Sequence, residues 1–78
     1  MNNEMKNFLK DLISILQEKY NDSLTKDGVS DDKKEFSQGL NFAYYDTLDI
    51  IESQLKLFGY DIDDLGIITP DLGKKIDS

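Results

Sequence analysis

Two series of apolar side chains, spaced mostly three and four residues apart, constrain the fold of this chain more than any other feature. The first runs through residues 5–24, and the second comprises Phe36, Leu40, Ala43, Tyr44, Leu48, Ile51, Leu55 and Phe58. Such spacings place side chains on one face of an α-helix, which has about 3.6 residues per turn. The sequence therefore predicts an all-α fold.

The periodicity places one helix over about residues 3–25 and a second over about residues 31–58. A connection of only about five residues joins them, and connections this short join antiparallel neighbours. We predict a long antiparallel helical hairpin with a C-terminal turn or short helix over 61–77, all within a single domain of residues 1–78.

Capping residues support both helix boundaries. Asn2 or Asn3 can cap the first helix, and Gly28 suits the turn that follows it. Ser30 is a typical N-cap for the second helix, and Gly59 can end that helix in a positive-φ conformation.

The C-terminal segment offers two local predictions. Asp61 can cap a short turn that Gly66 ends, and Thr69 followed by Pro70 is a typical start for a short helix reaching Lys75 or Ile76.

The same segment invites comparison with a calcium-binding loop, which needs acidic residues at positions 1, 3 and 5, glycine at 6 and glutamate at 12. Asp61, Asp63 and Gly66 match, but Leu65 and Leu72 occupy two of the ligand positions. We expect a capped turn here, and no metal site or cofactor in this chain.

The apolar face of the first predicted helix is wider than one neighbouring helix can cover. Its nine apolar side chains spread over about half of the circumference, against the ~100° stripe that one contact needs. Phe8, Leu12, Ile15 and Leu16 are therefore the candidates for self-association. A homodimer, assembled as a four-helix bundle, would bury them and would stabilise so small a core.

The composition excludes several classes of function. The chain contains no Cys and no His, which rules out the usual zinc sites, cysteine nucleophiles and serine triads. Its net charge of −7, with every cation a lysine, opposes direct binding to nucleic acids or to anionic membranes. No stretch approaches the roughly 18–20 apolar residues of a membrane span. We expect a cytoplasmic protein.

An acidic face on the second helix is the main candidate for binding a partner. Glu35, Asp46 and Asp49 project on one side together with Asp31, away from the apolar series. Phe42 lies within this face and Tyr45 lies beside it. A solvated surface that keeps the protein soluble is the simpler interpretation of the charges, and burial under the C-terminal segment or in a homodimer is the simpler one for the two aromatic residues. An exposed aromatic residue ringed by polar groups is also typical of an interface.

Gly39 and Ala43 form a pair of small residues four positions apart on the second helix. Such a pair lets another backbone approach closely, and we expect a tight crossing with the first helix at this point. A hinge is the alternative.

Three functions remain open. The first is a small acidic interaction module or regulator that binds a protein partner of unknown identity through helix surfaces. The second is an acidic decoy that mimics nucleic-acid phosphates and blocks a nucleic-acid-binding protein. The third, a small metal-dependent hydrolase, is disfavoured because the carboxylates of the second helix face away from the first. We expect no enzymatic activity.

Overall fold

The structure, a computed structural model, describes residues 2–24 and 31–76, except for the side chains of residues 31–33. It consists of helix α1 (Asn3–Asp22), helix α2 (Asp31–Leu57) and a one-turn 3₁₀-helix η1 (Ile62–Asp64), with no strand in the described part. The predicted all-α hairpin is confirmed, because α1 packs against α2. Neither helix of the described residues is long and apolar enough to cross a membrane.

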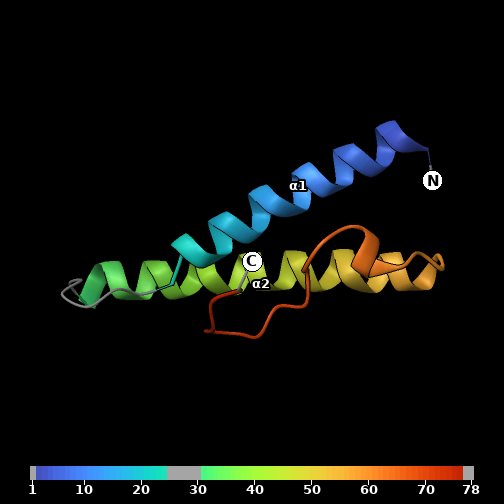
Figure 1. Cartoon of the computed structure of the whole chain (residues 1–78). Helices are drawn as coiled ribbons and strands as arrows, with labels where there is room; N and C mark the ends of the chain where they lie inside the picture. Colours follow the sequence, from blue (N-terminus) through green and yellow to red (C-terminus); the bar gives the residue numbers. More distant parts are fainter. Residues whose placement is uncertain (1, 25–30, 77–78) are drawn as a thin grey trace.

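The two helices do not lie parallel along their whole length (Figure 1). The last turns of α1 lie close to the middle of α2, and the N-terminal half of α1 diverges from it. The segment after α2, which we call the tail (residues 58–76), turns back and enters the opening between the two helices.

Local capping fixes the start of α1 and the end of α2 as predicted. The Asn2 side chain accepts a hydrogen bond from the Met5 amide at 2.8 Å. At the other end, the Tyr60 amide donates to the Leu55 carbonyl at 2.9 Å, and Gly59 has a φ of 80°. These contacts form a Schellman motif, in which glycine adopts the left-handed conformation at no steric cost.

The core consists of two clusters, and each contains residues from α1, α2 and the tail. Ile13, Leu55, Leu65 and Ile68 form the first cluster. Tyr20, Leu48 and Ile76 form the second. The tail therefore completes both clusters, and it fills the space that the diverging helices leave open.

The face that α2 buries differs from the predicted one. Leu48 and Leu55 are buried as expected, but Phe36, Leu40, Ala43 and Phe58 are exposed. Asn41, which does not belong to the predicted series, is buried in place of these exposed residues and is only 5% exposed. Its amide donates to the Tyr20 carbonyl at 3.2 Å and to the Ser23 hydroxyl at 3.1 Å. These bonds satisfy an acceptor at the end of α1, and they compensate for burying a polar side chain.

Two further predictions for single segments are wrong. The short helix expected after Thr69 and Pro70 does not form, because Asp71 and Ile76 are bound by α1 and Gly73 adopts a φ of 82°. The tight crossing at Gly39 is also absent. A Cβ atom built on Gly39 would meet nothing within 4 Å, since α1 does not cover this side of α2.

The predicted turn after Asp61 is confirmed, with the Asp61 side chain accepting from the Asp63 amide at 3.0 Å. The features predicted for Gly28, Ser30 and the Asp31 side chain lie outside the described residues.

Candidate partner-binding surface

The acidic face predicted on α2 carries exposed side chains at Glu35, Phe42, Asp46 and Asp49. We call it the Phe42 surface, and it comprises Glu35, Phe42, Tyr45, Asp46 and Asp49. The Phe42 side chain is 57% exposed, and Tyr45 is half-buried against the cluster around Tyr20. The two rings lie 6.4 Å apart between centroids, tilted by 36°, a spacing at which aromatic rings attract each other.

The three carboxylates of the Phe42 surface are exposed to solvent. In the described part of the chain, the ion pairs join Lys56 to Glu52 and Lys74 to Asp71. No described lysine therefore neutralises Glu35, Asp46 or Asp49. Exposed carboxylates that lack a cationic partner create a negative potential, which attracts positively charged groups.

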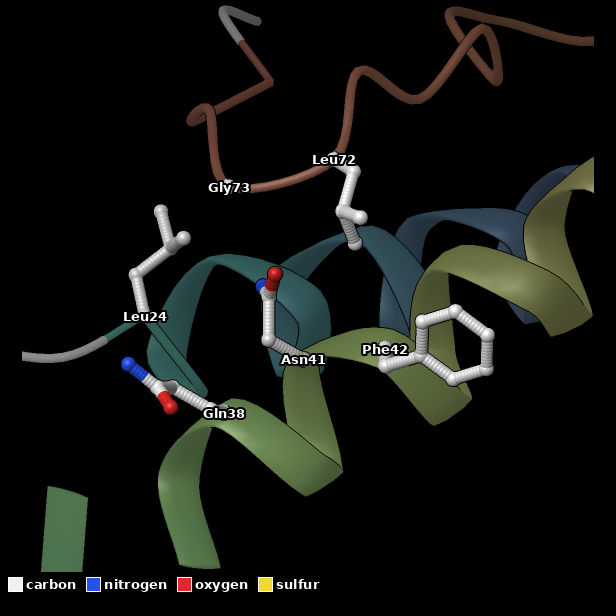
Figure 2. A pocket seen from close by; sticks show the side chains of 6 residues that line it. All are labelled: Leu24, Gln38, Asn41, Phe42, Leu72 and Gly73. Carbon is white, nitrogen blue, oxygen red and sulfur yellow. The ribbon is translucent and has the colours of Figure 1, made fainter. Parts of the chain in front are cut away.

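A pocket of about 560 Å³ opens beside Phe42, between α2 and the tail. Figure 2 shows Leu72 reaching from the tail toward α2, and Leu24 at the other side of the opening. Gln38, Asn41 and Gly73 complete the lining. The volume lies within the ~300–1,000 Å³ range of ligand-binding pockets. It can receive one large side chain of a partner.

Asn41 supplies a polar group inside this pocket. Its amide nitrogen is bound to Tyr20 and Ser23, while its oxygen lies on the side of the tail (Figure 2). No described residue donates a hydrogen bond to that oxygen. A group with an N–H or O–H donor that enters the pocket would therefore meet an acceptor held by a buried side chain.

Two contacts between α1 and the tail hold the pocket wall in place. The Tyr20 hydroxyl donates to the Asp71 carbonyl, next to Leu72. The Asn21 side chain donates to the Ile76 carbonyl at 3.0 Å and accepts from the Ile76 amide at 2.8 Å. Burial raises the pKa of Tyr20 above its ordinary value of 10.0, so the hydroxyl keeps its proton and remains a donor at neutral pH.

Reasoning from the sequence singled out Phe42 among the residues that line the pocket. It did not predict the pocket itself or its other lining residues, such as Asn41 and Leu72. The position of Leu72 depends on contacts between residues 51 and 55 positions apart, and no local pattern in the sequence indicates these contacts.

The four self-association candidates on α1 divide into two groups. Phe8 is 60% exposed and Ile15 is 44% exposed, so both remain largely uncovered. Leu12 is half-buried, and Leu16 packs against the cluster around Tyr20 and Leu48. The prediction that the apolar face of α1 extends beyond what α2 covers agrees with this distribution.

Among the described residues, no group of three or more acidic side chains lies close enough together to hold a metal ion. No protein-family model, curated protein or solved structure matches this chain.

Proposed function

We propose that this protein is a small interaction module that binds a protein partner through the Phe42 surface. The observation that carries the proposal is the position of Phe42, which is 57% exposed beside the pocket and flanked by carboxylates without described partners. Aromatic side chains at the centre of a patch with a polar rim are typical of residues that dominate binding energy. The role is binding and not catalysis, and we place it in the cytoplasm.

The chemistry of the surface favours a cationic partner segment with one large apolar side chain. Leu24, Phe42 and Leu72 would contact the apolar part of that side chain, and the Asn41 oxygen would accept a hydrogen bond from it. A tryptophan fits both requirements, because its indole is apolar and carries a single N–H donor. Lysine or arginine residues around it would face Glu35, Asp46 and Asp49.

The test uses a synthetic helical peptide that carries several lysines and one tryptophan, titrated into the isotope-labelled full chain. We expect the largest NMR shifts at the amides of residues 38–49 and 72–73. Phe42→Ala should weaken binding at least tenfold, whereas Phe58→Ala, which removes a comparably exposed ring outside this surface, should not. Equal effects of the two substitutions, or shifts elsewhere, would refute the proposal.

An acidic decoy that blocks a nucleic-acid-binding protein is the second candidate. The exposed carboxylates without described cationic partners favour it. The two functions differ in their dependence on salt. A contact that depends on Phe42 and the pocket should survive ~0.5 M salt, whereas a phosphate mimic should release its partner as the charges are screened.

We also propose that the module works as a homodimer with the form of a four-helix bundle. The exposure of Phe8 and Ile15 supports this proposal. The dimer and the partner site are separate proposals, since these two residues do not belong to the Phe42 surface.

A further inference from the structure

Helix α2 carries a second series of regularly spaced side chains, five of the seven apolar, that the hairpin does not bury. It comprises Phe36, Leu40, Ala43, Thr47, Ile50, Gln54 and Leu57, and we call it the α2 seam. Its steps alternate strictly between four and three residues, which is the heptad spacing of helices that pack side by side. All seven residues are exposed, with Phe36 at 69% and Leu57 at 74%. Thr47 bonds its hydroxyl to the Ala43 carbonyl at 2.9 Å, so its methyl group is free for apolar contact.

Helix α1 has a matching series on the same side of the hairpin. Its members are Met5, Phe8, Leu12 and Ile15, and we call it the α1 seam. A shallow depression lined by Lys19 and Asp22 of α1 and by Leu40 of α2 shows which sides of the two helices adjoin. Lys19 continues the α1 seam at heptad spacing, and Leu40 belongs to the α2 seam. Both seams therefore lie on one face, and the pocket beside Leu72 lies on the other.

In the described part of the chain, the register of the hairpin places α1 beside the later turns of α2 and not beside its first turns. Tyr20 packs with Leu48, and Ile13 packs in the cluster of Leu55, so α1 runs alongside the C-terminal half of α2. Figure 1 shows α2 extending well past the end of α1 toward its own N-terminus. Phe36 lies in the second turn of α2, and its side chain is largely exposed.

The total accessible surface of the chain is large enough to favour an interface with a second copy. The accessible surface is 5729 Å², whereas a compact monomer of 8.9 kDa exposes about 4,800 Å². The excess of about 900 Å² is close to the ~800 Å² that each partner buries in a standard interface. The radius of gyration of 13.9 Å also exceeds the ~11.5 Å of a compact chain of this length.

We propose that a second copy of the chain covers this face, with the two α2 helices crossing antiparallel near Thr47. In this arrangement Thr47 meets Thr47 of the other copy, and the small Ala43 lies opposite the large Ile50. Phe36 of each copy then lies opposite Leu57 and beside the α1 seam of the other. The arrangement is symmetric, and it covers the exposed seams of each copy with the first turns of α2 from the other copy. It assigns surfaces to the dimer proposed above and does not depend on binding a partner at the Phe42 surface.

The first test compares two identical substitutions on different sides of α2. Sedimentation equilibrium of the full chain at micromolar concentration should give twice 8.9 kDa. Phe36→Ser should weaken dimerisation at least tenfold, because each dimer loses two buried rings. Phe42→Ser should leave it unchanged. Both rings are largely exposed in the single chain, so neither change should reduce helix content by circular dichroism. A monomeric wild-type chain, or equal effects of the two substitutions, would overturn the proposal.

The second test determines the direction of the crossing and uses the absence of native cysteines. Thr47→Cys should oxidise rapidly to a disulfide-linked dimer, because the proposed axis passes beside this residue and a disulfide needs Cα atoms within ~7 Å. Leu57→Cys should not, since an antiparallel crossing separates the two copies of residue 57. Ser14→Cys, outside both seams, provides the background rate. Efficient cross-linking through residue 57 would exclude the antiparallel arrangement.

Discussion

Gly39 occupies an exposed position in α2 where glycine has no structural role. No atom lies within 4 Å of a Cβ built there, and its φ is not positive. Gly39→Ala should therefore raise the free energy of unfolding by about 1 kcal/mol, because glycine is the more flexible residue in the unfolded chain. Urea unfolding followed by circular dichroism measures the change. Gln38→Gly, which introduces a glycine at the neighbouring exposed position, should lower the free energy of unfolding by a similar amount. A loss of stability in Gly39→Ala would contradict this account.

Tyr20 makes the stability of the folded chain depend on pH in the alkaline range. Burial raises its pKa in the folded chain above 10.0, so the unfolded chain loses this proton at lower pH than the folded chain. The contribution is constant below pH 10 and is lost as the pH rises from there toward the folded pKa. Tyr20→Phe should flatten this decline and should also cost about 1 kcal/mol at neutral pH, because the bond to Asp71 is lost. Tyr60→Phe, at an exposed position, should retain the decline in pH-dependent unfolding measurements.

Asn41 shows where prediction from the sequence fails at the level of a residue. Apolar spacing identified α2 correctly, but it assigned Phe36 and Leu40 to the core because both are apolar. The buried face is instead the one that carries Asn41, whose amide binds Tyr20 and Ser23 from α1. A polar side chain is buried where it finds partners, and these partners lie 21 and 18 positions away in the sequence.

Apart from η1, the tail has no regular secondary structure, and side chains of α1 hold it in place. Asn21 binds both the amide and the carbonyl of Ile76, as a neighbouring strand would. Asn21→Ala should reduce stability by about 1–3 kcal/mol and speed hydrogen exchange at the Ile76 amide. Asn7→Ala, at an exposed position of the same helix, is the matched control. Unchanged exchange at Ile76 would show that the apolar contacts of the tail are sufficient to hold it.

Boundaries of the elements were easier to predict than their packing. Asn2, Gly59 and Asp61 act within a few residues of themselves, and the structure confirms all three. The helix expected after Pro70 has an equally good local start but does not form. Binding of Asp71 and Ile76 by α1 outweighs the weak propensity of so short a helix.

The two proposed interactions of the whole molecule should respond to salt in opposite directions. Each chain carries a net charge of −7, and Glu4, Asp11 and Glu18 form an exposed edge beside the α1 seam. Salt screens repulsion between two such chains, so dimerisation should strengthen several-fold between ~0.02 and ~0.5 M NaCl. Binding of the cationic peptide should weaken over the same range, although the contacts of the Phe42 pocket should keep it measurable. Sedimentation measures dimerisation, and fluorescence titration measures binding of the peptide. If salt changed both affinities in the same direction, the assignment of the two interactions to separate faces would be contradicted.

The exposure of apolar side chains on α1 was predictable from the sequence, while the exposure of the α2 seam was not. The wide apolar face of α1 indicated a second neighbour, and Phe8 and Ile15 are indeed exposed. The α2 seam is exposed because α2 turns Asn41 toward α1 in place of Phe36 and Leu40. Only the folded structure reveals this orientation.

The division of the core into two clusters has a consequence for how the chain melts. Each cluster takes residues from α1, α2 and the tail, so neither can form while any one of these segments is detached. Separate clusters would ordinarily allow separate transitions. Here the shared segments couple them, and heating should remove both in one cooperative step, with a calorimetric enthalpy equal to the van't Hoff enthalpy.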